Sequence, residues 1–221
     1  MRARYEIDNK RYYRRALTDA ILEKMLTYVD SSTIYGRSVR CMLLFAKATA
    51  LRSQNYVYTK DGAEALTRIK NITFIPNIEN PTSFIVVLPK TKTNNVDAPN
   101  RETRTIECRC DKGISCVVHE LAELLKDRMH CKNEALFLME NGFPITYNAL
   151  HEILKILCDA VGIDWHYYTS HALRIGEATD QNRRGVPLEK TMKFICWKSR
   201  KSAMIYIRPD NEDNVKFEIV W

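Results

Sequence analysis

The spacing of apolar residues changes twice along this chain, and this change limits the available folds more than any other feature. Apolar residues recur at helical intervals as far as Arg52, whereas "NITFIP", "SFIVVLP" and "RTIECRC" are short β-branched runs bounded by turn residues. Helical intervals return from "SCVVHELAELLKDRM" onwards. We therefore predict an α+β fold that is mainly helical, with a small three-stranded antiparallel sheet in its middle.

The composition favours a soluble protein with an anionic partner. The 221 residues carry 34 lysines and arginines against 27 aspartates and glutamates, a net charge of +7 that favours polyanions. Hydrophobic residues make up 45% of the chain, but no apolar run approaches the roughly 20 residues of a membrane span. Seven cysteines and an N-terminus without a signal sequence are typical of a reducing compartment. We expect an intracellular protein, nuclear if the host is eukaryotic.

Four residues near the C-terminus have a spacing with chemical meaning. His171 and Arg174 are three residues apart within a predicted helix, so both side chains lie on one face. Trp197 and Tyr206 are nine residues apart across a predicted turn and a short helix. Each residue alone has an ordinary explanation, as a solvated charge, a core residue or one of eleven tyrosines. Together they form a more specific pattern.

The segment "SHALRIGEATDQNRRGVPLEKTMKFICWKSRKSAMIYIRP" resembles the C-terminal signature of the tyrosine recombinases. In that signature a His-x-x-Arg helix is followed by a Gly-Val-Pro turn, a His or Trp, and a nucleophilic Tyr nine residues later. The motifs "LRIGEAT" and "WKS…YIRP" look most like those of integrases from eukaryotic mobile elements of the Crypton and DIRS kind. The resemblance implies the catalytic domain of that family, with its mainly helical α+β fold.

The resemblance also implies two residues further upstream. The family's first arginine ends a buried helix ahead of the sheet, which is the position of Arg52 in "FAKATALRSQN". The family's lysine lies on a β-turn of the sheet, where "VLPKTKTNN" offers Lys92, with Lys90 as the alternative. An acidic residue usually stands three positions after the first arginine, but Asn55 stands there in this chain. Glu177 is a substitute by residue type.

The implied reaction is a transesterification at a DNA phosphodiester. Tyr206 would attack phosphorus and release the 5′-oxygen, giving a 3′-phosphotyrosyl link that a second 5′-hydroxyl reseals without ATP. Arg52 and Arg174 would bind the non-bridging oxygens, because guanidinium groups stay charged and form forked hydrogen bonds. Of the other groups, His171 would bind the phosphate or accept the tyrosine proton, Trp197 would donate its indole N–H, and Lys92 would protonate the leaving oxygen.

The implied partner is double-stranded DNA. The implied assembly on DNA is a homo-oligomer, a tetramer, with a monomer as the alternative for the isolated protein. These roles require no cofactor, metal or membrane. Contacts to the DNA backbone are expected from basic residues outside the catalytic set, although each is equally explained as a solvated surface charge. They are Lys90, Arg183, Arg184, Lys198, Arg200 and Lys201.

A zinc site is an alternative use of one segment. "CRCDKGISCVVH" contains Cys108, Cys110, Cys116 and His119, all of types that bind zinc. However, Cys-x-Cys is a less usual spacing than Cys-x-x-Cys, no second pair follows, and a cysteine that opens an amphipathic helix is an ordinary core residue. On spacing alone we expect no metal here.

The chain is expected to divide into a basic N-terminal arm (1–15), a catalytic domain (16–208) and a C-terminal tail (209–221). The tail contains "NVKFEIVW", which alternates like a strand and would either dock on a neighbouring subunit or fold back on its own domain. Two points stay open: whether a helical core-binding domain belongs ahead of this one, and whether Tyr206 acts in its own site or in a neighbour's.

Two other functions use much of the same sequence pattern. A type IB topoisomerase or a telomere resolvase has the same phosphotyrosine chemistry, and a domesticated recombinase that no longer cleaves would keep the basic fold for DNA binding. The presence of Tyr206 with both Arg52 and Arg174 favours an enzyme. The sequence does not identify the DNA target.

Overall fold

The computed structural model describes residues 14–89, 102–197 and 199–204. Its α-helices are α1 (Asp19–Leu26), α2 (Ile34–Thr49), α3 (Val117–Leu125), α4 (Tyr147–Ala160), α5 (Ser170–Arg183), α6 (Leu188–Ile195) and α7 (Arg200–Met204). Its strands are β1 (Ile72–Ile75), β2 (Ser83–Val87) and β3 (Thr103–Glu107). Short 3₁₀ helices are η1 (Ser53–Asn55), η2 (Lys60–Ala65), η3 (Ile69–Asn71), η4 (Cys110–Lys112), η5 (Lys126–Arg128) and η6 (Trp165–Tyr167).

The three strands form one antiparallel sheet in the order β1-β2-β3. Its register places Phe74 opposite Phe84 and Phe84 opposite Ile106, so one buried row of large side chains crosses all three strands. Such cross-strand pairs are the units that stabilise a sheet. The predicted α+β fold with its small antiparallel sheet is therefore confirmed.

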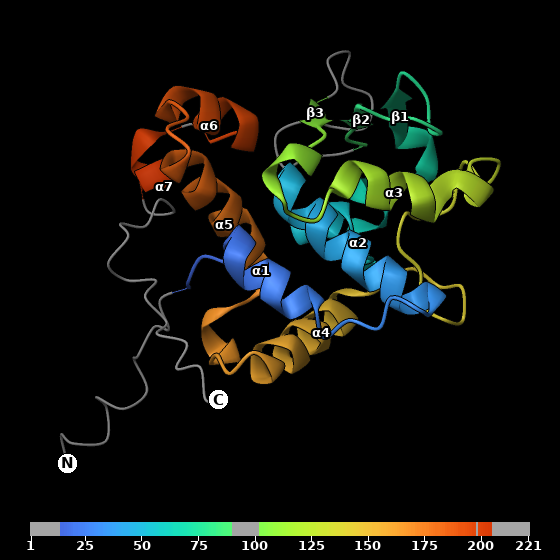
Figure 1. The fold of residues 1–221 in the computed structure, drawn as a ribbon, viewed down its shortest axis with the longest axis horizontal. Helices are drawn as coiled ribbons and strands as arrows, with labels where there is room; N and C mark the ends of the chain where they lie inside the picture. The colour runs from blue at the N-terminus through green and yellow to red at the C-terminus, as the bar shows by residue number, and fades with distance from the viewer. Residues whose placement is uncertain (1–13, 90–101, 198, 205–221) are drawn as a thin grey trace.

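Helix α2 is the centre of the fold. It runs between α5 on one side and the sheet and α3 on the other, and α6 and α7 lie beyond α5 (Figure 1). Phe45, in the second half of α2, is fully buried, with its ring centroid 5.9 Å from that of Phe84 and 5.5 Å from that of Phe137. A helix that is apolar on nearly all sides belongs in the interior of a domain. The C-terminal end of α2 is consequently fixed from several directions.

The predicted elements occur where the sequence pattern placed them, with small shifts at their ends. The helix expected to end near Arg52 ends at Thr49, and Arg52 follows the turn after it. Helices α4 and α5 are followed by glycines with positive φ, Gly162 (76°) and Gly185 (73°), which is the usual way for a helix to stop. None of the helices in the described part of the chain combines the length and apolar composition that a membrane span requires.

Several predictions fall outside the described residues. They concern most of the N-terminal arm, Lys90, Lys92, Lys198, Tyr206 and the C-terminal tail. Residue 201 lies within α7, but its side chain is outside the description.

Candidate active site

Two helices end in the same way at the candidate site. After α2, Ala50 adopts a left-handed conformation (φ 48°), and after α6, Cys196 does the same (φ 59°). A left-handed residue turns the chain sharply out of the helix. The residues presented just after these turns are Arg52 and Trp197, two of the predicted catalytic residues.

Arg174 joins these two turns. It lies on α5, is 2% exposed, and donates from Nη1 to the carbonyl oxygen of Ala50 and from Nη2 to that of Ile195, both at 2.5 Å. Its guanidinium carbon also lies 5.9 Å from the centroid of the Trp197 ring. Cations are stabilised at helix C-termini because the carbonyl groups there carry a partial negative charge. Arg174 therefore fixes the relative position of the segments that carry Arg52 and Trp197.

Arg104, which the sequence analysis did not select, supports the same helix end. It is a buried residue of β3 that donates to the carbonyl oxygen of Thr49, pairs with Glu102 at 2.8 Å, and lies over the ring of Phe194 at 5.3 Å. Arg104 thus links the sheet to the end of α2 and to α6. No sequence motif marked it, because its contacts join three distant segments.

His171 lies in a positive electrostatic environment. It occupies the first turn of α5 and is half-buried. Burial lowers its pKa most, the charges of Arg174, Arg14 and Arg52 act in the same direction, and together they bring it from 6.5 to about 4. The imidazole is consequently uncharged at neutral pH and able to accept a proton. The three arginines come from α5, the N-terminal segment and the turn after α2, so the fold brings together the predicted residues Arg52, His171, Arg174 and Trp197.

Arg14 is a residue that the sequence analysis assigned only to a basic arm. The segment that follows it lies along the start of α5, where the N–H of Arg15 donates to the carbonyl oxygen of Tyr167 and the N–H of Leu17 to that of Ala172. Helix α5 accommodates this segment at Gly176, where an added Cβ would lie 1.9 Å from the carbonyl oxygen of Leu17. The backbone contact therefore requires a glycine on α5, and it holds Arg14 near His171.

A buried ionic network joins the second half of α5 to Lys47 of α2. The Lys47 side chain is 2% exposed, and its Nζ lies 2.5 Å from Asp19 Oδ1, 2.6 Å from Asp180 Oδ2 and 3.5 Å from Glu177 Oε2. Burial opposes a charge on Lys47, yet Glu177, Asp180 and Asp19 raise its pKa. Burial also opposes the charge on Asp19 and so would raise its pKa. Lys47, Arg109 and Arg184 nevertheless hold the pKa of Asp19 below its usual value.

Glu177, proposed from sequence as a substitute acid, belongs to this network. Its side chain is fully buried, and its Oε1 accepts hydrogen bonds from Arg109 at 3.1 Å, Arg184 at 3.0 Å and Gln181 at 3.0 Å. Asn55, at the position of the usual acid, is buried and donates from its side chain to the carbonyl oxygen of Ala65. Glu177 thus braces α5 against α2 through Lys47.

The residues predicted to contact the DNA backbone differ in their surroundings. Arg184 forms ion pairs with Glu177 and with Asp19, the latter at 3.3 Å, so its guanidinium is engaged within the domain. Arg183 lies 3.8 Å from Asp180. Arg200 is exposed at the start of α7. Of these three, Arg200 is the most available for a phosphate contact.

The family model described as "Phage integrase family" matches residues 90–213, more than half of the chain. The chain belongs to the phage integrase family. The predicted membership in the tyrosine recombinases, first indicated by His171, Arg174 and Tyr206, is thereby confirmed at the level of the family. Among curated proteins, none is similar enough in sequence to be matched.

Solved structures with the same fold include recombinases and a transposon integrase. The XerH site-specific recombinase in a post-cleavage complex with a palindromic difH substrate has a TM-score of 0.62 at 17% identity, over 88% of this chain and 49% of that one. XerA recombinase gives a TM-score of 0.60 at 14% identity, over 93% and 62%. The Tn1549 transposon integrase with circular intermediate DNA gives 0.56 at 18% identity, over 88% and 62%. The chain therefore spans between about half and just under two thirds of the length of these proteins.

Proposed function

We propose that this chain is the catalytic domain of a site-specific recombinase or integrase that cleaves and rejoins double-stranded DNA through a 3′-phosphotyrosyl intermediate. The observation that carries the proposal is the position of Arg174, which joins the two turns that present Arg52 and Trp197, and whose charge, with those of Arg14 and Arg52, helps to keep His171 uncharged. A phosphodiester gains negative charge in its transition state, and preorganised cationic donors stabilise that charge. The site offers this environment without a metal in any assigned role.

Each assigned role follows from the chemistry of its side chain. Arg52 binds a non-bridging oxygen, and Arg174, held in place by its two carbonyl contacts, contributes positive charge beside the phosphate. His171, uncharged at neutral pH, accepts the proton of the Tyr206 hydroxyl or binds the phosphate. Trp197 donates its indole N–H, and Lys92 (or Lys90) protonates the leaving 5′-oxygen. Tyr206 forms the covalent link.

The proposed setting is a mobile element. The motifs "LRIGEAT" and "WKS…YIRP" resemble the integrases of Crypton and DIRS elements, and one protein with this fold is a transposon integrase by name. The proposed assembly is a tetramer on DNA, with the tail 209–221 docking on a neighbouring subunit. Arg183, Arg200 and the basic residues at 198 and 201 are the proposed backbone contacts, with Arg184 acting within the domain.

The test is a trap for the covalent intermediate. A pool of nicked duplexes with random sequence around the nick is incubated with the protein, and any 5′-hydroxyl fragment released beside the nick diffuses away and leaves the adduct intact. The native chain is expected to form an adduct that survives denaturation. The Tyr206→Phe variant is expected to form none, whereas Tyr28→Phe, at an exposed tyrosine after α1, behaves as the native chain.

The alternative functions give different results in the same experiment. An adduct that forms without sequence preference, together with relaxation of supercoiled plasmid, would assign the chain to the topoisomerases. Binding of DNA without an adduct from any member of the pool would assign it a non-cleaving role. An adduct that persists in Tyr206→Phe would overturn the choice of nucleophile.

A further inference from the structure

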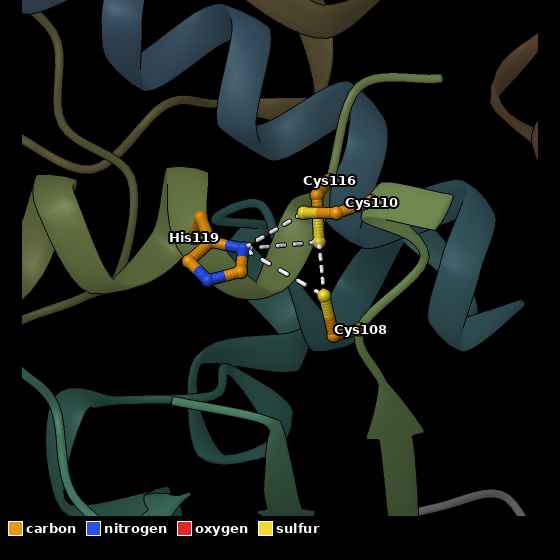
Figure 2. Close-up of side chains that lie close together, drawn as sticks. All are labelled: Cys108, Cys110, Cys116 and His119. Atoms are coloured by element: carbon orange, nitrogen blue, oxygen red, sulfur yellow. Dashed lines mark hydrogen bonds between the residues drawn. The ribbon is translucent and has the colours of Figure 1, made fainter. Parts of the chain in front are cut away.

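Three cysteines and a histidine form a cluster outside the candidate active site. Cys108 follows β3, Cys110 begins η4, Cys116 is the N-cap of α3, and His119 lies in the first turn of α3. The three Sγ atoms and one ring nitrogen all lie within 4.8 Å of one another. Figure 2 shows the four side chains pointing toward a common centre. Among the described residues, this is the one group of three or more such ligands brought together in this way.

The distances fit a tetrahedral zinc ion. With Zn–S bonds of about 2.3 Å and a Zn–N bond of about 2.0–2.1 Å, a tetrahedron requires S···S separations of about 3.8 Å and S···N separations of about 3.5 Å. The Sγ atoms of Cys108 and Cys116 are 3.6 Å apart. The Nδ1 atom of His119 lies 3.8 Å from Cys108 Sγ, 3.2 Å from Cys110 Sγ and 3.4 Å from Cys116 Sγ.

The chain reaches this geometry by local turns that the spacing of the cysteines does not reveal. Gly113 adopts a left-handed conformation (φ 63°) and turns the chain after η4, which returns Cys116 to the end of β3. Cys116 and His119 are then three residues apart at the start of one helix and face the same side. The objection that Cys-x-Cys lacks a second pair therefore fails, because the second pair is Cys116 and His119.

Neither core packing nor a disulfide accounts for the cluster. Cys110 and His119 are exposed and Cys108 is half-buried, so only Cys116 is a core residue. A disulfide requires two sulfur atoms about 2.0 Å apart, far less than the 3.6 Å between Cys108 and Cys116. The other cysteines, Cys41, Cys131, Cys158 and Cys196, are also free thiols and take no part in the cluster.

We propose that Cys108, Cys110, Cys116 and His119 bind one structural Zn²⁺ ion that fixes the connection between β3 and α3. Four protein ligands close the coordination sphere, which is the arrangement of structural rather than catalytic zinc sites. Each thiol loses its proton to solvent on binding, and the ion bridges four side chains that are otherwise joined only by weak S···N and S···S contacts.

The connection between β3 and α3 that the ion would fix is in contact with α5. Arg109, between Cys108 and Cys110, is one of the cations that pair with Glu177 of α5, at a distance of 3.1 Å. Ser115, one residue before Cys116, is held by Glu23 of α1 through its N–H at 2.9 Å and its hydroxyl at 2.8 Å. The zinc ion would therefore hold Arg109 in the ionic network and support α5 from outside the active site.

Metal content tests the site directly. The native chain, purified without chelator, is expected to contain about one zinc ion per molecule by elemental analysis, and the double variant Cys110→Ser/His119→Ala fewer than about 0.1. The double variant changes two exposed residues, which limits any effect on packing. Cys131→Ser, at a thiol outside the cluster, is the matched control and keeps its zinc. His119→Cys also keeps it, because four cysteines are an equally good zinc set.

Two results would overturn the proposal. One is a folded native chain that contains no zinc and shows no tetrahedral cobalt–thiolate absorption when Co²⁺ is added. The other is a full complement of zinc in Cys110→Ser/His119→Ala, which would place the ion elsewhere. A thermal unfolding series with EDTA adds a second readout: the melting temperature of the native chain is expected to fall and that of the double variant to stay constant. None of these measurements depends on DNA cleavage, so they stand apart from the proposed function.

Discussion

The two halves of α5 use charge in opposite ways. In the first half, His171 and Arg174 lie in a positive environment with Arg14 and Arg52, strong enough to help lower the pKa of His171 to about 4. In the second half, Glu177 and Asp180 are matched by Lys47, Arg109 and Arg184 in a buried network. Positive charge gathered around an uncharged histidine favours an anionic ligand, whereas the buried ion pairs of the second half hold the helix. The predictions below test this difference.

Removing the central cation of the second half should have the largest effect. Lys47→Met removes the buried cation that pairs with Asp180 at 2.6 Å and also faces Glu177 at 3.5 Å, and breaking a buried ion pair from one side costs about 3–5 kcal/mol of unfolding free energy. Urea unfolding measures the loss. Lys126→Met, which removes an exposed ion pair with Glu123, is the control and is expected to change stability by less than about 1 kcal/mol. Equal effects of the two variants would show that the network is not structural.

Arg52→Ala should affect the reaction rather than the fold. Loss of one positioned donor to the phosphate is expected to lower the rate of adduct formation by about 10²–10³. The melting temperature should stay close to that of the native chain, because Arg52 is half-buried in the turn after α2. Arg37→Ala, at an exposed arginine in the first turn of α2, is the matched control. If both variants cleave at the native rate, the first half of α5 is not the phosphate site.

Gly176→Ala tests the contact that places Arg14. The added Cβ would lie 1.9 Å from the carbonyl oxygen of Leu17, so the N-terminal segment must move away from α5. We expect a loss of about 1–3 kcal/mol in unfolding free energy from this overpacking. Helix propensity alone predicts the opposite sign, a gain of about 1 kcal/mol. A neutral or stabilised variant would therefore show that the segment does not pack on Gly176.

The last expected effect is a pH dependence from His171. Its pKa is lowered to about 4 in the folded chain, so the folded state binds fewer protons than the unfolded state between that value and about 6.5. The stability that this contributes is complete above pH 6.5 and is lost as the pH falls toward 4. His171→Ala should flatten the curve in that window.

Proton NMR of the imidazole resonances follows the same residue directly, with His171→Ala used to assign its signal among the five histidines. Addition of DNA should raise the pKa of His171, because a phosphate favours the charged form. A His171 that titrates near 6.5 without DNA would show that the positive environment is absent.

The sequence was sufficient for the elements and for the residues of one local motif. Apolar spacing located α2, α3 and the three strands, and the His-x-x-Arg spacing placed His171 and Arg174 on one face, because these features are local. Lys47 gave a partial signal, since a lysine within the apolar "LLFAKATA" must be paired if it is buried. The same sequence did not identify its partners, which lie on α1 and α5.

The remaining site residues depend on contacts between segments far apart in the chain. Arg14 acts on the pKa of His171 from an N-terminal segment that lies against Gly176, and Arg104 reaches the end of α2 from β3. The cluster of Cys108, Cys110, Cys116 and His119 depends on one left-handed turn at Gly113. No spacing rule contains this information, so these features emerge only from the fold.

The most direct test of the proposed activity is to identify the residue that carries DNA in the trapped adduct. Trypsin should release the peptide Ser202–Lys216 in one piece, because the bond between Arg208 and Pro209 resists cleavage, and Tyr206 is its one tyrosine. After nuclease digestion, mass spectrometry is expected to find a 3′-linked nucleotide on Tyr206. A nucleotide on any other residue, or a native chain that forms no adduct with any duplex of the random pool, would contradict the assignment of this chain as a tyrosine recombinase catalytic domain.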